Sequence, residues 1–248
     1  MSRAIPLLLI IGGLTICSGC IQETGPTIGV AASLRDVMPE LARTYERTTG
    51  SPSPSFSFGA SGTLAKQLEA GAPMHGVVLA SATEIDALVE QGLIDSSTRS
   101  VLANNTLVLA GGHGARAGGL SEIPEDDATF RIAIGDPRFV PAGEHARAAL
   151  KARGMWDAMS RRAIFTRDVT AAVALLRRGE VNRALIYDTD VRRHPELRVL
   201  ETVRASKRPV VIAARAPGTK RLSEFYEFLS GPRAATIFES HGFEVSKR

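Results

Sequence analysis

The chain has 248 residues, of which 44% are hydrophobic and 23% are charged. These fractions are those of ordinary globular proteins, and they exclude collagen-like, coiled-coil and low-complexity chains. Thirty Lys and Arg residues against 26 Asp and Glu residues leave a formal net charge of +4, with basic residues in scattered pairs such as Arg177-Arg178. This charge alone neither requires nor excludes nucleic acid. Because nucleic-acid binding usually gathers basic residues on one face, we expect no such partner.

The first twenty residues have the pattern of an export signal. A short positive start precedes an apolar run from Ile5 to Ile16, which is too short to span a bilayer. The segment Cys17-Ser18-Gly19-Cys20 resembles the cleavage site of bacterial lipoproteins, except that Cys17 stands where leucine is usual. We expect residues 1–19 to be a lipoprotein signal peptide and Cys20 to be acylated, with plain secretion as the alternative. The protein would then be exported to the periplasm or the outer face of the cell membrane, and its only membrane contact would be the lipid anchor.

Metal and thiol chemistry have little support in the sequence. The two cysteines are Cys17 and Cys20, so the part of the chain expected to fold has no possible internal disulfide and no cysteine-based metal site or nucleophile. His75 has no second histidine or carboxylate at the spacing of metal ligands. We therefore expect no metal bound directly by protein side chains.

Glycine, proline and serine divide the remaining chain into alternating strands and helices. This alternation predicts an α/β fold with one or two mainly parallel sheets. No interdomain linker is evident, so two domains would have to share strands across their boundary. The expected strands are 27–31, 53–58, 77–80, 106–110, 132–134, 184–187 and 210–213, and the expected helices are 34–49, 63–69, 83–91, 142–153, 169–178, 222–229 and 234–240.

The junctions between strands and helices are candidates for anion binding. Each helix start leaves about four backbone N–H groups without intrahelical partners and carries roughly half a positive charge, so several starts aimed at one point attract an anion. Ser33 and Ser61 stand at the first two junctions and add hydroxyl donors. The other interpretation is that both serines only cap their helices, as serine often does.

Several segments resemble the periplasmic molybdate-binding proteins of ABC transporters in order and spacing. The resemblance covers most of the chain after the leader, and several motifs in order are far more specific than either serine alone. The segments are Ala31 to Leu34, Phe58 to Ala65, Gln67 to Pro73, Ile134 to Pro137, Val140 to Gly143, Asp168-Val169, Ile186 to Asp190, Gly231-Pro232, Ala234-Ala235 and Phe238 to Phe243.

The resemblance implies a fold and a division of the chain. The fold is α/β, of the two-lobed periplasmic binding protein type (type II), with the ligand in the cleft between two mainly parallel-sheet lobes. Lobe I would comprise residues 20–105 and 208–248, and lobe II residues 106–207. The protein would act as a monomer whose closure around the ligand is the signal for the permease and ATPase of an importer.

The resemblance also implies a ligand and its contacts. In that family an oxyanion is held by serine and tyrosine hydroxyls and by backbone amides. Carried onto the matching positions, the hydroxyl donors are Ser33, Ser61 and Tyr187, and the backbone N–H donors are Ala142 and Val169. The implied ligand is molybdate or tungstate, with no cofactor and no catalytic step.

The chemistry of the ligand fits such donors. Molybdate and tungstate are fully deprotonated dianions near neutral pH, so every oxygen accepts hydrogen bonds and none donates. Phosphate keeps a proton that would need an acceptor, and an unpaired buried polar group costs about 1–3 kcal/mol. Sulfate also lacks a proton and differs mainly in size, so a receptor for sulfate remains an alternative, as does a fold-related sensory module.

One segment departs from the family pattern, and an enzyme is an alternative to the receptor. The segment from Met74 to Ser81 departs from the family pattern, and His75 and Ser81 replace acidic residues while Leu79 replaces a serine. An enzyme is the alternative of a different class, namely a serine hydrolase using Ser61. That alternative needs a Gly-x-Ser-x-Gly turn, and Thr63 occupies its last glycine position.

Overall fold

The computed structural model describes residues 25–245, except 113, 124–126, 128 and 205–208. The export signal and the acylation site at Cys20 lie outside this part of the chain and stay predictions. Among the described residues no helix is both long enough and apolar enough to cross a membrane.

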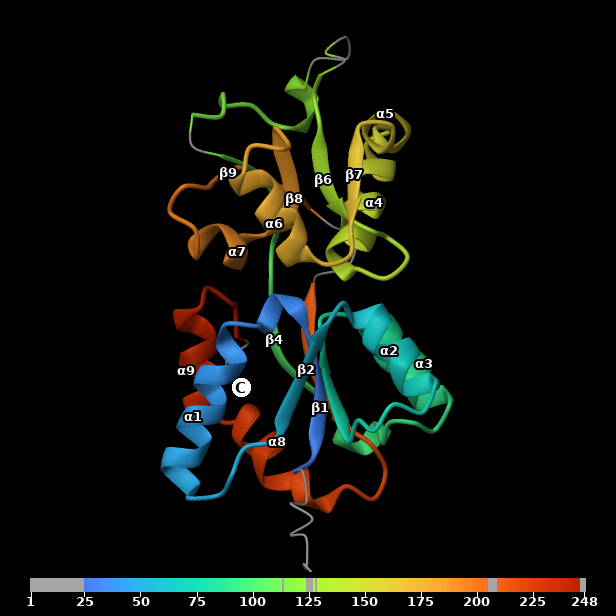
Figure 1. The fold of residues 1–248 in the computed structure, drawn as a ribbon, viewed down its shortest axis with the longest axis vertical. Coiled ribbons are helices and arrows are strands. Elements are labelled where there is room, and N and C mark those ends of the chain that lie inside the picture. Colours follow the sequence, from blue (N-terminus) through green and yellow to red (C-terminus); the bar gives the residue numbers. More distant parts are fainter. Residues whose placement is uncertain (1–24, 113, 124–126, 128, 205–208, 246–248) are drawn as a thin grey trace, which may run out of the picture.

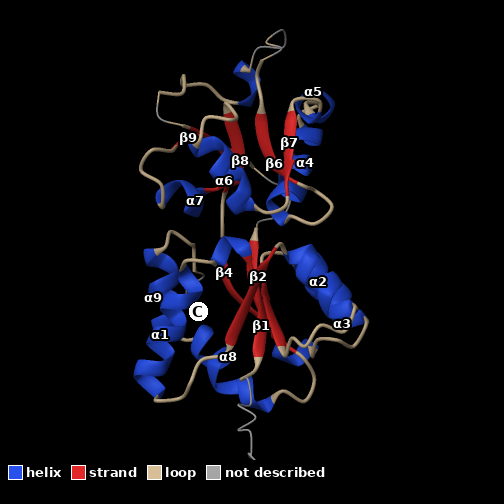
Figure 2. Ribbon diagram, in the orientation of Figure 1, coloured by secondary structure: helices blue, strands red, loops and turns tan. Residues whose placement is uncertain are grey.

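The molecule consists of two α/β lobes stacked along its longest axis (Figure 1). Each lobe is built on a five-stranded sheet, with strand orders β2-β1-β3-β10-β4 and β7-β6-β8-β5-β9. Figure 2 shows both sheets enclosed by helices, with loops from the two lobes facing each other across the junction. The predicted two-lobed α/β fold is confirmed.

The first lobe is formed by both ends of the described chain. Helices α1, α8 and α9 share one apolar core with the sheet, and α2 and α3 share another on the opposite side. Its elements are β1 (Thr27–Ala31), the 3-10 turn η1 (Ala32–Leu34), α1 (Val37–Thr49), β2 (Ser55–Gly59), α2 (Ser61–Glu69), β3 (Gly76–Leu79), α3 (Ala82–Glu90), the 3-10 turn η2 (Ser96–Thr98), β4 (Ser100–Asn104), β10 (Val210–Arg215), the 3-10 turn η4 (Lys220–Leu222), α8 (Ser223–Leu229) and α9 (Pro232–Ser240).

The second lobe is formed by the middle of the chain around a single core. Its helices α4 and α6 connect parallel strands and pack against the sheet. Its elements are β5 (Leu107–Gly111), the 3-10 turn η3 (Leu120–Glu122), β6 (Ile132–Gly135), α4 (Pro141–Ala152), α5 (Trp156–Ser160), β7 (Ala163–Thr166), α6 (Val169–Arg177), β8 (Arg183–Tyr187), α7 (Asp188–Arg192) and β9 (Arg198–Thr202).

Each sheet is mixed, with four strands running in one direction and one strand running against them. In each sheet three neighbouring strands are parallel, whereas β10 and β5 run antiparallel to both of their neighbours. The reversal follows from the chain path, because β5 and β10 are the strands by which the chain enters each lobe from the other. The expected lobe boundaries at 105/106 and 207/208 stay predictions, since 205–208 lie outside the described residues.

The first crossing between the lobes is held by polar side chains. The backbone of Asn104 pairs with Glu244 through hydrogen bonds of 2.7 and 3.0 Å. The amide of Asn105 donates to the hydroxyl of Thr189 over 3.0 Å, and this contact is buried. Thr106 donates to the Glu244 carboxylate over 3.1 Å. The crossing is therefore a structured joint, in which hydrogen bonds from both lobes hold the connecting segment.

Candidate functional site

A small cavity between the lobes brings the five predicted site residues together. It has about 20 Å³ of free space, against about 550 Å³ for a groove beside β4 at the outer edge of the first lobe. A site of this size suits one small inorganic ion better than an extended molecule. The lining consists of Ala31, Ala32, Ser33, Ala60, Ser61, Ala80, Val140, Pro141, Ala142, Asp168, Val169 and Tyr187.

Two serines supply the hydroxyls of the first lobe. Ser61 is the first residue of α2 and is fully buried, and its Oγ accepts the backbone N–H of Ala80 over 3.1 Å. With that lone pair occupied, the hydroxyl proton of Ser61 is free to point elsewhere. Ser33 is 5% exposed and lies in the 3-10 turn η1. The sequence predicts a helix starting directly after Ser33, but α1 begins at Val37 because the 3-10 turn intervenes.

Two helix starts supply backbone donors from the second lobe. Pro141 is the first residue of α4, so Ala142 has the first N–H group of that helix. Val169 is the first residue of α6, and the preceding Asp168 caps this helix by accepting the N–H of Ala171 over 2.8 Å. N–H groups in the first turn of a helix have no intrahelical acceptor and carry the positive end of the helix dipole. Both helix starts face the cavity.

Tyr187, at the end of β8, is the third hydroxyl of the cavity. Its side chain is 2% exposed, and its oxygen is one of the few buried polar side-chain atoms in the described structure without a hydrogen-bond partner. Burial, together with neighbouring carboxylates of which Asp190 has the largest effect, raises the pKa of Tyr187 well above its ordinary value. The phenol therefore stays protonated near neutral pH and has a proton to donate. A buried hydroxyl without a partner is costly unless a ligand accepts from it.

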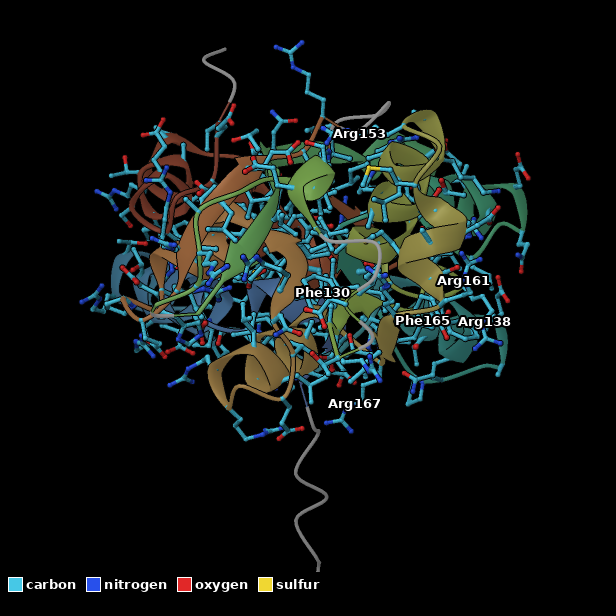
Figure 3. The ribbon with its side chains drawn as sticks, turned by 90° about the horizontal axis from the view of Figure 1, so that it is seen from above. Phe130, Arg138, Arg153, Arg161, Phe165 and Arg167 are labelled. Atoms are coloured by element: carbon cyan, nitrogen blue, oxygen red, sulfur yellow. The ribbon has the colours of Figure 1, made fainter. Side chains whose placement is uncertain are left out.

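No lysine or arginine belongs to the cavity lining within the described chain. Three arginines stand within two positions of a lining residue: Arg35 is exposed in the first lobe, and Arg138 and Arg167 lie on the outer rim of the second lobe (Figure 3). The side chains of Arg138 and Arg167 are 73% and 89% exposed. The carboxylate of Asp168 is turned to its own helix, as the cap described above. The cavity thus offers hydroxyl and amide donors and attracts negative charge without a cation.

The lobes touch on both sides of this cavity, so the cleft is closed. On one side the N–H of Gly62 donates to the carbonyl oxygen of Phe139 over 3.0 Å, and the ammonium of Lys66 lies 4.5 Å from the centre of the Phe139 ring. On the other side Arg193 forms an ion pair with Asp36. The sequence gives no signal for these contacts because their partners are far apart along the chain.

The departures from the family pattern have local structural roles. The Nδ1 atom of His75 accepts the backbone N–H of Thr27 over 3.2 Å, so this side chain links the starts of two adjacent strands. Leu79 is fully buried in the core beside α3. The hydroxyl of Ser81 donates to the carboxylate of Glu84 in the first turn of α3. Burial, and to a smaller extent Glu144, raises the pKa of that carboxyl.

The described residues include no group of three or more His, Cys, Asp or Glu side chains arranged to hold a metal ion. His75, the one histidine considered as a ligand from the sequence, is engaged with the backbone of Thr27.

Comparison with known proteins agrees with the geometry. The family model described as bacterial extracellular solute-binding protein matches residues 26–244. The molybdate-binding protein ModA of Escherichia coli is 32% identical over 232 residues, which is 88% of this chain and 88% of the relative. The ModA protein of Haemophilus influenzae is 29% identical over 228 residues, with 88% of this chain and 89% of the relative covered.

Solved structures give the same picture. The substrate-binding domain of a putative molybdenum ABC transporter from Clostridium difficile superposes with a TM-score of 0.70 at 26% identity, covering 90% of this chain and 99% of that one. The periplasmic molybdate-binding protein of Azotobacter vinelandii superposes with a TM-score of 0.78 at 19% identity, covering 90% and 100%. The chain therefore belongs to the bacterial extracellular solute-binding protein family, together with the molybdate-binding proteins to which it is similar.

Proposed function

We propose that this protein captures molybdate or tungstate outside the cytoplasm and delivers it to an ABC importer. The ligand would lie in the cavity between the lobes, with Ser33, Ser61 and Tyr187 donating through hydroxyls and Ala142 and Val169 through backbone N–H groups. The oxyanion would be bound as cargo, without a cofactor and without chemical change.

The observation that carries this proposal is the buried hydroxyl of Tyr187. It is protonated, has no partner in the described structure, and lies in a cavity where the serine hydroxyls and the N–H groups of two helix starts are also donors, while the carboxylate of Asp168 is engaged with Ala171. Such a site leaves nothing unpaired when a dianion with four acceptor oxygens enters. A monoprotonated phosphate would bring a donor with no acceptor opposite it, at a cost of about 1–3 kcal/mol. Size then favours the larger molybdate and tungstate over sulfate, whose hydrogen bonds would be stretched.

A hydrolase using Ser61 has no comparable support. No histidine belongs to the lining within the described residues, and the carboxylate of the lining residue Asp168 accepts the N–H of Ala171 instead of the Ser61 hydroxyl. The Oγ of Ser61 already accepts from Ala80, an arrangement that directs its proton outward as a donor.

Closure links binding to transport in this proposal. Donors from both lobes meet the same ion, so the closed form is stabilised by the ligand, and the permease would recognise that form on a monomeric receptor. The relatives named as ABC transporter components support such a partner. An acylated Cys20 would keep the receptor on the outer face of the membrane, near the permease.

Isothermal titration calorimetry tests the proposal with molybdate, tungstate, sulfate and phosphate in the same buffer. We expect tight binding of the first two ions, weaker binding of sulfate and no binding of phosphate. Preferential binding of sulfate would assign the receptor to another oxyanion. The absence of heat with all four ions would refute an oxyanion receptor.

A further inference from the structure

Arg193, just after α7, contacts both lobes. Its Nε donates to the carbonyl oxygen of Thr189 over 3.0 Å, which fixes the direction of the side chain. The two other nitrogens of the guanidinium form ion pairs with Asp190 in the same lobe and with Asp36 in the first lobe. The planar fork of arginine can hold all three acceptors at once, which a lysine ammonium on its flexible stem does less well.

In the second lobe this network reaches the ligand cavity. Asp190 is 3% exposed, and its Oδ2 accepts the backbone N–H of Tyr187 over 3.1 Å. The side chain of the same Tyr187 presents the unpaired hydroxyl to the cavity. Arg193 thus acts on the backbone of Tyr187 indirectly, through the carboxylate of Asp190.

In the first lobe the network also ends close to the cavity. Asp36 directly precedes α1 at the N-cap position, but its side chain makes no capping hydrogen bond. Aspartate usually satisfies a free N–H group at this position. Here the carboxylate is directed to Arg193 of the other lobe instead, three residues after the cavity residue Ser33.

We propose that Arg193 is a positioning residue of the ligand site, which locks the closed cleft through Asp36 and holds the backbone of Tyr187 through Asp190. The inference rests on the proposed function, because it assigns the lock to the same oxyanion cavity. Neither carboxylate belongs to the cavity lining. The guanidinium that joins the lobes also determines the orientation of the Tyr187 hydroxyl, through Asp190.

The two arms of the network differ in expected strength. The Asp36 side chain is 57% exposed and that of Arg193 is 21% exposed, so the bond between the lobes is largely a surface ion pair. Exposed pairs of this kind have small effects, so loss of the Asp36 arm should speed ligand dissociation about two- to fivefold. The Asp190 carboxylate is buried, and removing its cation leaves that charge unpaired, so Arg193→Gln should speed dissociation more than tenfold.

The first experiment measures the dissociation rate of molybdate by stopped flow for the wild type, Asp36→Asn and Asp36→Glu. The matched control is Asp86→Asn, because Asp86 pairs with Arg99 within the first lobe and its side chain is 54% exposed. We expect faster dissociation only for Asp36→Asn, with recovery in Asp36→Glu. Equal rates for Asp36→Asn and Asp86→Asn would overturn the lock.

The second experiment measures amide hydrogen exchange of Tyr187 in the unliganded protein. We expect faster exchange in Arg193→Gln, partial protection in Arg193→Lys, and no change in the control Arg178→Gln, whose arginine pairs with Glu180 at the surface. Unchanged protection in Arg193→Gln would overturn the positioning role. If the wild type fails to bind molybdate, the proposed function fails, and this exchange measurement still decides the role of Arg193.

Discussion

Gly62 sets how far the two lobes can close. It is the second residue of α2, and a Cβ atom built on it would lie 2.9 Å from Cα and 3.0 Å from the carbonyl oxygen of Phe139 in the opposite lobe. Ordinary carbon contacts need about 3.5 Å or more. Gly62→Ala therefore forces the lobes apart at this point by about half an ångström, because the obstacle is backbone and has no rotamer to escape into.

The expected loss of affinity follows from that displacement. The Gly62 hydrogen bond to Phe139, now 3.0 Å, would be stretched, at a net cost of about 0.5–1.5 kcal/mol. The donors of the second lobe would also move away from the ligand, while those of the first lobe stay in place. Weakening one charge-assisted hydrogen bond to the ligand in this way adds about 1–2 kcal/mol to the loss of binding free energy. Together these terms predict molybdate binding that is weaker by about 1.5–3.5 kcal/mol, or roughly 10- to 300-fold.

The same substitution should have the opposite effect on the unliganded protein. Alanine is favoured over glycine in a helix by up to about 1 kcal/mol, so α2 and the open form gain stability. Titration calorimetry and urea unfolding without ligand measure the two effects, with Thr63→Ala as the control that also improves helix propensity at an exposed position of the same turn. Unchanged affinity in Gly62→Ala would refute the closed geometry at Phe139. If Gly62→Ala and Thr63→Ala lose the same affinity, the loss comes from the changed helix propensity of α2 and not from the contact with Phe139.

Three further predictions concern buried polar groups. Tyr187→Phe should weaken molybdate binding by about 1.5–3 kcal/mol without lowering the stability of the unliganded protein, since its hydroxyl has no protein partner to lose. The control Tyr226→Phe loses a hydrogen bond outside the cavity, so it should lower the stability and leave the affinity unchanged. Calorimetry measures the affinities, and urea unfolding measures the stabilities. Ser61→Ala should lower the affinity for molybdate by a similar amount. It should also lower the free energy of unfolding by about 1–3 kcal/mol, because the N–H of Ala80 loses its acceptor. A stability equal to that of the wild type would contradict the hydrogen bond between Ala80 and Ser61. Burial raises the pKa of Asp190 from 3.8 in the unfolded chain to about 6 in the folded protein, so between these pH values the folded state binds a proton that the unfolded chain does not. Protonation of Asp190 therefore stabilises the fold fully below pH 3.8, and this stabilisation is lost as the pH rises through 6. The unfolding free energy of the wild type minus that of Asp190→Asn should therefore fall by up to about 3 kcal/mol over this range, and a difference independent of pH would contradict the raised pKa.

The sequence predicts the elements around the cavity because their signals are local. Pro141 at the start of α4 and Asp168 as the cap of α6 fix where these helices begin, and both positions agree with the structure to within one residue. The junction at Ser33 was harder to predict, because a 3-10 turn and an α-helix share the same apolar pattern over so few residues.

The sequence did not predict the short helices α5 and α7 or three strands, and all three of these strands lie at sheet edges. Strands β4, β7 and β9 have four or five residues, and each exposes part of its length, as at Val101, Phe165 and Val199. Their hydrophobic pattern is therefore too weak to separate them from loops. Pairing with an inner strand, rather than local propensity, determines their conformation.

The contacts that close the cleft had no signal of their own. Arg193 and Asp36 are 157 positions apart, and an arginine pair such as Arg192-Arg193 reads as solvated surface. Phe139 meets Gly62 through its backbone, so its side-chain type carries no information about the contact. Asp190 lies within the segment that resembled the family, yet only the structure relates its carboxylate to Tyr187 and Arg193.

The strand order of the first sheet has a consequence for how the protein acquires its shape after export. Strand β10 lies between β3 and β4, although it follows them by more than a hundred residues, whereas every strand of the second sheet comes from one continuous stretch. Contacts between distant parts of a chain form slowly, because the intervening loop must first be closed. A chain that reaches the far side of the membrane with its N-terminus first can therefore assemble the middle lobe while β4 still lacks its neighbour. The pocket, which needs both lobes, would be the last part of the molecule to become functional.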